Sequence, residues 1–171
     1  MILVKHFAAA FRFLTIIPLP GRLGTDEDDL KGALPYFSLV GIVLGLLAGA
    51  AAWILCSSFP PLVAAVFLTL ILLSFSGALH LDGLADSADG FFSSREREQI
   101  LEIMRDSRIG VMGVVALVML LLLKVSALAQ LDPKNAVQAA ILMPIAGRSA
   151  LVLMMFLLPY VRPEGGFAIC S

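Results

Sequence analysis

Three aspartates in one short polar stretch have the residue type and the spacing to bind a divalent cation. Asp82, Asp86 and Asp89 recur at i, i+4 and i+7, a spacing that places all three on one face of a helix. Carboxylates that converge repel one another unless a positive charge lies between them. Because oxygen-only ligands favour Mg²⁺ or Mn²⁺ over zinc, we expect a magnesium site here.

The same polar stretch, residues 80–110, also carries guanidinium groups. Arg105 and Arg108 flank Asp106, and guanidinium forks match the geometry of phosphate oxygens. Acidic residues and arginines together at a membrane surface indicate metal-assisted phosphoryl transfer to or from a diphosphate. A solvated acidic loop is the simpler alternative, but the regular spacing and the small residues between the aspartates argue against it.

The composition excludes an ordinary soluble domain. The 171 residues are 60% hydrophobic and 15% charged, and the mean hydropathy is +0.97, whereas soluble domains are about half apolar and about a quarter charged. A formal net charge of −1 provides no basic field for nucleic acid. Cys56 and Cys170 form no metal or disulfide pattern. We therefore expect an all-α polytopic membrane helix bundle that forms a single domain over residues 1–171.

Apolar runs in the chain predict about four transmembrane helices. Residues 32–81 contain no Asp, Glu, Lys or Arg, which is too long for one span of about 20 residues. The sequence SSFPP at residues 57–61 divides this stretch in two. The expected spans are residues 33–56, 62–80, 109–131 and 136–161, with the polar loop 80–110 between the second and the third. Gly41, Gly45 and Gly49 form a ridge of small residues that favours close helix packing.

A short amphipathic helix is predicted before the first span. Phe7, Phe11 and Leu14 recur at i, i+4 and i+7, which is typical of a helix that lies in the membrane interface; a frayed N-terminus is the alternative. Inside the fourth apolar run, Arg148 stands near the middle. A charge at that depth is costly and by default functional, although an arginine paired with a carboxylate inside the bundle is the alternative.

The basic residues of the short loops predict the orientation in the membrane. The N-terminal segment carries Lys5, Arg12, Arg22 and Lys31, and the polar loop carries Arg95, Arg97, Arg105 and Arg108. The turn at residues 57–61 has no basic residue, and the turn at residues 132–135 has one. We therefore expect the N-terminus and the acidic loop to face the cytoplasm.

Several segments together resemble a known family. They are HLDGLADSADGFF at residues 80–92, ILEIMRDSRIGVMGVVAL at 100–117, FRFLTIIPLP at 11–20, YFSLVG at 36–41 and the GR pair at 147–148. On these motifs the sequence resembles the adenosylcobinamide-GDP ribazoletransferase family, the cobalamin synthases. Members of that family are longer and have further membrane helices, so we expect the C-terminal part of the family domain to be missing here.

The resemblance implies a Mg²⁺-dependent transferase of the bacterial cell (inner) membrane. Such an enzyme joins adenosylcobinamide-GDP to α-ribazole or α-ribazole 5′-phosphate and releases GMP. Its product is adenosylcobalamin or the corresponding 5′-phosphate, in the last steps of cobalamin biosynthesis. The partners are then small molecules and no nucleic acid, and the glycine ridge is compatible with a homodimer.

Combined with the resemblance, the residues predict how the reaction is catalysed. A bound Mg²⁺ neutralises the GMP leaving group while a ribazole 5′ oxygen attacks the phosphorus that bears the cobinamide. An aspartate that does not bind the metal is the first choice as proton acceptor, ahead of a histidine at the helix end, and arginines stabilise the phosphate charge. The expected metal ligands are Asp82, Asp86 and Asp89; the expected catalytic residues are Asp82, Asp89, Asp106 and His80; the expected phosphate-binding residues are Arg105, Arg108 and Arg148.

Two other functions are compatible with parts of this pattern. A CDP-alcohol-type phosphotransferase also uses clustered aspartates and Mg²⁺, but its usual signature has an arginine where this chain has Asp86. A transporter or ion channel with an acidic gate would carry its carboxylates inside the spans, whereas those of this chain lie between them. A flux assay in liposomes separates the transport function from the transferase.

Overall fold

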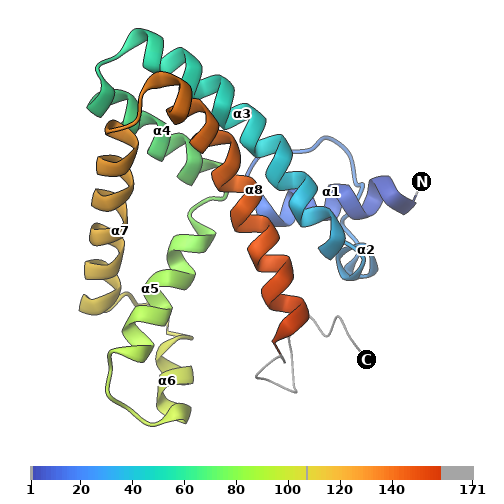
Figure 1. Cartoon of the computed structure of the whole chain (residues 1–171). Coiled ribbons are helices and arrows are strands. Elements are labelled where there is room, and N and C mark those ends of the chain that lie inside the picture. The colour runs from blue at the N-terminus through green and yellow to red at the C-terminus, as the bar shows by residue number, and fades with distance from the viewer. Residues whose placement is uncertain (1, 107, 159–171) are drawn as a thin grey trace. The chain divides into compact units, whose positions relative to one another are not determined.

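In the computed structural model, residues 2–106 and 108–158 are described, and every regular element among them is a helix. The all-α class expected from the sequence is therefore confirmed. The chain divides into two compact units, which Figure 1 shows in blue-to-cyan with red and in green-to-yellow. Of the described residues, the first unit holds those up to Ser58 and those from Asp132 to Leu158, and the second is Phe59–Leu131. Residues 159–161 of the expected fourth span lie outside the described residues, as does Cys170.

Among the described residues, three helical segments are long and apolar enough to cross a membrane. They are Leu34–Ser58, Val111–Ala129 (α7) and Pro133–Leu157 (α8). A fourth candidate consists of α4 (Pro61–Phe75) and α5 (Leu79–Phe91), two helices that meet at a bend of 90°. A polytopic membrane protein with three or four spans in this part of the chain agrees with the expected helix bundle.

The second apolar run, expected as one helix to residue 80, breaks after Phe75. Gly77 and Ala78 both have a positive φ, 56° and 63° respectively, and this left-handed backbone commonly ends a helix. The amide of Ala78 donates to the carbonyl of Leu73 at 3.3 Å, which closes the last turn of α4. The chain then enters α5 in a new direction, so the aspartates lie on a separate helix and not on a continuation of the span.

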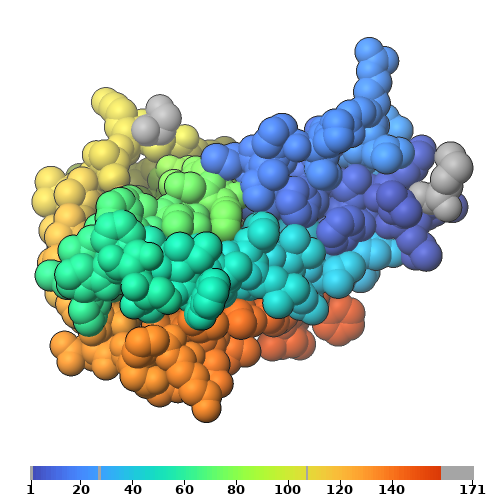
Figure 2. Space-filling model, turned by 90° about the horizontal axis from the view of Figure 1, so that it is seen from above, coloured from blue at the N-terminus to red at the C-terminus, as the bar shows by residue number. Residues whose placement is uncertain are grey.

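In the first unit, α3 (Phe37–Ser58) runs beside α8 (Figures 1 and 2). The ridge of small residues is the contact surface. A Cβ atom at Gly45 would overlap the backbone carbonyl of Ile141, and one at Gly41 would lie 2.9 Å from the carbonyl oxygen of Pro144. The close packing predicted for the ridge is confirmed. Because the ridge is covered by α8 of the same chain, it no longer argues for a homodimer, which stays a prediction without this support.

The expected N-terminal amphipathic helix is α1 (Ile2–Leu14). It is followed by the short helices α2 (Glu27–Lys31) and η1 (Leu34–Tyr36). Phe11 and Leu14 are buried, and α1 contacts α2, η1 and α3. Part of the apolar face that we expected in the membrane interface therefore packs on the protein itself.

Arg12 of α1 makes hydrogen bonds to the segment that follows the helix. Its Nη2 donates to the carbonyls of Leu19 at 2.7 Å and Gly21 at 2.6 Å, and its Nε donates to the carbonyl of Leu23 at 3.1 Å. One guanidinium thus satisfies three backbone carbonyls, which the single ammonium of lysine cannot do with the same geometry.

We therefore expect Arg12→Lys to lower the free energy of unfolding by about 2 kcal/mol, since hydrogen bonds to charged groups contribute about 1.5–3 kcal/mol each and lysine retains part of the set. Thermal unfolding in detergent, followed by circular dichroism, measures the change. The matched control is Arg22→Lys, because the Arg22 side chain is exposed. Equal melting temperatures for the two variants would contradict the structural contribution of Arg12.

In the second unit, α7 packs against both α4 and α5, and α6 (Arg97–Ile103) packs against α5. Gly90 of α5 provides the room for α6. A Cβ atom at this glycine would lie 2.9 Å from the side chain of Met104 and 3.2 Å from that of Ile100. The second unit thus contains α5, α6 and α7, and the polar stretch of residues 80–110 begins in α5 and ends just before α7 (Figure 1).

Candidate active site

One helix, α5, carries all three aspartates of the predicted metal site. Because α5 is helical from Leu79 to Phe91, the i, i+4, i+7 spacing places the three on one side of it. Ala85 and Ala88, the small residues between them, are buried against the protein. Because these two residues are small, α5 can pack closely against the protein where they lie, while Asp82 near its start stays exposed.

The three carboxylates do not have the same environment. Asp82 is exposed, whereas Asp86 and Asp89 are half-buried. The negative charges of Asp82 and Asp89 both act on Asp86, which lies between them along the helix. Such mutual repulsion would be relieved by a bound cation.

Asp89 is engaged by the backbone at the start of α7. Its Oδ2 accepts a hydrogen bond from the amide of Gly110 at 2.7 Å, and its Oδ1 accepts one from the amide of Gly113 at 2.8 Å. Both carboxylate oxygens are therefore used within the protein. The sequence reasoning missed this pairing, although a signal existed in the Gly-x-x-Gly spacing of the two glycines at the end of the polar stretch.

Among the described residues, no three His, Cys, Asp or Glu side chains are placed so that they could hold a metal ion. The magnesium site with three aspartate ligands therefore stays a prediction. Asp82 and Asp86 nevertheless present two carboxylates one helical turn apart, and Mg²⁺ is often bound by one or two carboxylates with water and substrate phosphates completing its shell. The donor set of α5 fits a magnesium ion of that kind.

Arg108 and Asp106 form an ion pair in the loop between α6 and α7. The Arg108 Nη2 lies 2.7 Å from Asp106 Oδ2, its Nε donates to both carboxylate oxygens at 3.1 Å, and its backbone amide donates to Oδ1 at 3.1 Å. These bonds lower the pKa of Asp106 below the usual aspartate value and raise the pKa of Arg108. A lowered pKa makes Asp106 a weaker base than the sequence reasoning expected.

The ion pair predicts how Asp106 titrates. Since its folded-state pKa is depressed, the interaction contributes above the usual aspartate pKa and is lost as the pH falls through the lowered value. We expect Arg108→Gln to raise the pKa of Asp106 toward the ordinary value of about 3.9. Carbon-13 NMR of the aspartate carboxyl measures the shift, with Arg22→Gln as the control. A pKa of Asp106 that Arg108→Gln leaves unchanged would contradict the pairing.

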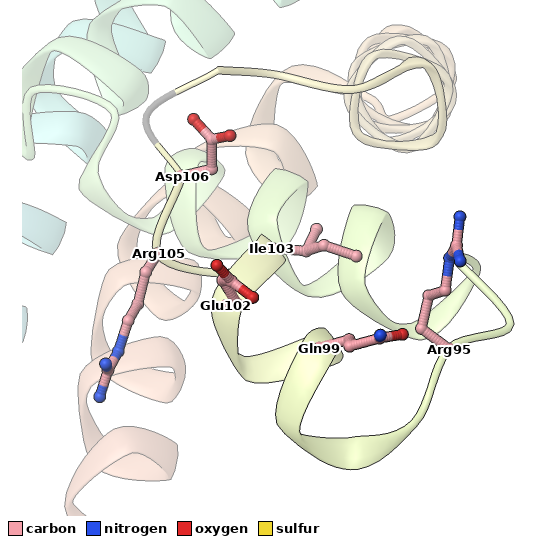
Figure 3. Close-up of a pocket in the computed structure, with 6 residues that line it drawn as sticks. All are labelled: Arg95, Gln99, Glu102, Ile103, Arg105 and Asp106. Atoms are coloured by element: carbon pink, nitrogen blue, oxygen red, sulfur yellow. The ribbon is translucent and has the colours of Figure 1, made fainter.

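A shallow pocket of about 580 Å³ lies along α6 and the loop after it. Figure 3 shows Gln99, Glu102 and Ile103 projecting from this helix, with Arg105 and Asp106 pointing in opposite directions from the loop. Arg95, just before the helix, completes the lining. Two guanidinium groups, two carboxylates and an amide provide donors and acceptors for a polar, phosphate-bearing ligand. Of these six residues, the sequence reasoning had singled out only Arg105 and Asp106.

Of the two other expected site residues, His80 belongs to α5 and Arg148 to the first unit. His80 is in the first turn of α5 and exposed, but residues two apart on a helix point to different sides, so it does not share a face with Asp82. Arg148 is on α8 in the first unit, next to Gly41, and its buried Nε has no hydrogen-bond partner in the described part of the chain. Its participation in a phosphate site stays a prediction.

These features define a helical membrane protein. One compact unit of it contains α5, which carries three aspartates, and the loop between α6 and α7, which carries Arg105 and Arg108. A model of the cobalamin-5-phosphate synthase family matches residues 6–170, so the chain belongs to this family. The family resemblance found in the sequence motifs is thereby confirmed.

Curated relatives extend this finding. The adenosylcobinamide-GDP ribazoletransferase of Desulforamulus reducens is 42% identical over 161 residues, which are 94% of this chain and 64% of the relative. Proteins of the same name from Clostridioides difficile and Klebsiella pneumoniae are 36% and 40% identical, over 95% of this chain and 63% and 68% of their own lengths. The chain thus spans about two thirds of the relatives that it matches. No solved structure matches it.

Proposed function

We propose that the chain functions as an adenosylcobinamide-GDP ribazoletransferase of the bacterial inner membrane. The reaction joins adenosylcobinamide-GDP to α-ribazole or α-ribazole 5′-phosphate and releases GMP. The observation that carries the proposal is the family match over residues 6–170, with relatives of that name aligned along 94–95% of the chain. The carboxylates of α5 and the guanidinium of Arg105 in the same unit fit phosphoryl transfer, and the family match favours it over a CDP-alcohol phosphotransferase or a transporter.

Asp82 and Asp86 are the residues that would hold a magnesium ion. They share one side of α5, Asp82 is exposed, and each leaves a carboxylate for a shared cation. When bound, Mg²⁺ supplies Lewis-acid stabilisation of the diphosphate and of the leaving phosphate. A site of two carboxylates completed by water and substrate needs no third protein ligand, which is consistent with the absence of a three-residue cluster among the described residues.

The other residues act by positioning and by charge. Phosphoryl transfer passes through a loose transition state, so catalysis comes mainly from orientation and electrostatic stabilisation. Arg105 lines the pocket beside α6 and binds a phosphate of the diphosphate substrate. Asp106 holds Arg108 and thereby shapes the loop. The ribazole oxygen forms the new bond to the phosphorus that bears the cobinamide, the bond to GMP breaks, and the hydroxyl proton passes to water at the exposed side of α5.

The direct test is GMP release from adenosylcobinamide-GDP by the purified protein in liposomes. Release is expected only when both α-ribazole and Mg²⁺ are present, together with formation of a product that contains both the cobinamide and the ribazole. Release without α-ribazole would point to a hydrolase and would contradict the proposal. Competition between α-ribazole and α-ribazole 5′-phosphate in the same assay determines which acceptor is used.

The orientation is a further part of this proposal. Basic residues on both sides of α6 support a cytoplasmic position for α5 and α6 by the positive-inside tendency. A cysteine introduced at Glu98, an exposed residue of α6, is expected to react with an impermeant thiol reagent only from the cytoplasmic side. Labelling of inside-out and right-side-out vesicles measures this. Equal labelling in both preparations, or labelling from the outside alone, would contradict the orientation.

A further inference from the structure

The start of α7 is capped by a residue from another helix. Gly110 is the N-cap residue of α7, and its position provides no side-chain cap. The first amide groups of a helix have no partner within the helix, and two of them, those of Gly110 and Gly113, donate to the carboxylate of Asp89. A negative charge at this end is also favoured by the helix dipole.

The positions of Gly110 and Gly113 leave no room for a side chain beside Asp89. A Cβ atom at Gly110 or Gly113 would overlap the Asp89 carboxylate, and one at Gly113 would also lie 3.0 Å from the carbonyl oxygen of Ala85. Gly113 lies inside α7 with no positive φ, so glycine is needed there for close approach and not for backbone conformation. Since glycine weakens a helix relative to alanine, its presence indicates that this approach matters.

The hydrogen bond between Asp89 and Gly110 joins the two ends of a chain segment that contains polar residues of the proposed site. Asp89 and Gly110 are 21 residues apart in the chain, and between them lie α6, the pocket residues and the Asp106–Arg108 pair. Fixing both ends of this segment limits the positions that Arg105 can take relative to α5. Asp86 and Asp82 lie one and two turns earlier on the same helix, and in the described part of the chain neither accepts a hydrogen bond from the start of α7.

We infer that Asp89 is a positioning residue, distinct in its task from Asp82 and Asp86. Its carboxylate ties α5 to the start of α7 and so fixes where the loop between α6 and α7 joins α5, the helix whose Asp82 and Asp86 would bind the cation. For its effect on catalysis this inference rests on the proposed function, whereas the anchoring of α7 by Asp89 is tested separately by amide exchange.

The test compares Asp89→Asn with Asp82→Asn in the purified protein. An asparagine oxygen still accepts one amide, but its NH₂ group cannot accept the other. Hydrogen–deuterium exchange of peptides that cover residues 109–114 is measured without substrate, and the Mg²⁺ concentration for half-maximal GMP release is measured with it. For Asp89→Asn we expect at least tenfold faster amide exchange in this segment, slower GMP release and an unchanged Mg²⁺ requirement. For Asp82→Asn we expect the reverse: unchanged exchange and a raised Mg²⁺ requirement.

A second variant approaches the same contact from the other side. Gly113→Ala places a methyl group against the Asp89 carboxylate while leaving every acidic residue in place, so it should also accelerate exchange at residues 109–114 without raising the Mg²⁺ requirement. The matched control is Ser87→Ala on α5, whose hydroxyl donates at 2.6 Å only to the carbonyl of Gly83 in the same helix; exchange should stay at the wild-type rate.

The inference is overturned if Asp89→Asn leaves the exchange of residues 109–114 unchanged, or if it raises the Mg²⁺ requirement as Asp82→Asn does. Failure of the proposed function has a different signature. In that case the wild-type protein releases no GMP, while the exchange experiment still decides whether Asp89 anchors α7.

Discussion

Replacing Asp82 by Asn is expected to reduce GMP release about 10³-fold. Asp82 is exposed on α5 and shares its side with Asp86, so the substitution removes the more accessible of the two carboxylates that would hold the cation. A loss of about 4 kcal/mol of transition-state stabilisation is the size typical of such metal sites and corresponds to this factor. Because Asn has nearly the same shape, α5 should form and the protein should insert as before. Initial rates at saturating substrates, measured over a range of Mg²⁺ concentrations, give the effect.

The matched control for this prediction is Glu98→Gln. It also replaces an exposed carboxylate by its amide in the second unit, but on a part of α6 that does not line the pocket. Its rate should stay within about twofold of the wild type, as is usual for surface changes away from a site. An Asp82→Asn protein that is correctly folded and keeps more than a tenth of the wild-type rate would remove Asp82 from the metal site.

The second large effect is expected for Gly45→Leu in α3. A side chain at this position would overlap the backbone carbonyl of Ile141 in α8, and a carbonyl in a helix cannot move aside as a flexible side chain can. The two helices must then separate along their whole contact, which also breaks the hydrogen bond between Ser149 and Ser38 at 3.0 Å. We expect a loss of about 3 kcal/mol in the free energy of unfolding, measured as a lower melting temperature in detergent.

Gly147→Ala is the control for the glycine ridge. Gly147 belongs to α8, and a Cβ atom added there meets nothing within 4 Å. Because alanine is a better helix former than glycine, this variant should be as stable as the wild type or more stable, by up to about 1 kcal/mol. If Gly45→Leu and Gly147→Ala have equal melting temperatures, the packing of α3 on α8 through the ridge is incorrect.

In the polar stretch of residues 80–110, residue spacing alone predicted only part of the arrangement. The i, i+4, i+7 pattern placed Asp82, Asp86 and Asp89 on one side of a helix, and α5 confirms the helix. The pattern gave no reason to separate the three. The structure does so, because the amides that bind Asp89 come from residues 21 and 24 positions further along the chain, a distance that helical periodicity does not address.

The apolar runs likewise predicted where helices lie but not which helices pack together or where one of them breaks. Hydrophobicity located the spans, and the glycine ridge on α3 indicated a close helix contact, but only the structure identifies α8 as the partner. The run at residues 62–80 carries no charged residue or proline that would signal its end early. The break after Phe75 depends on the left-handed backbone of Gly77 and Ala78, and alanine rarely adopts that conformation unless its surroundings require it.

The sequence by itself determined the class of this protein, because composition, run lengths and helical periodicity are local properties that depend on near neighbours along the chain. It also determined the family, through motifs such as HLDGLADSADGFF. The tertiary structure decided which groups meet: α3 with α8, Arg12 with the carbonyls after α1, and Asp89 with Gly110 and Gly113. Such contacts join residues far apart in sequence, and they form only when packing brings their helices together.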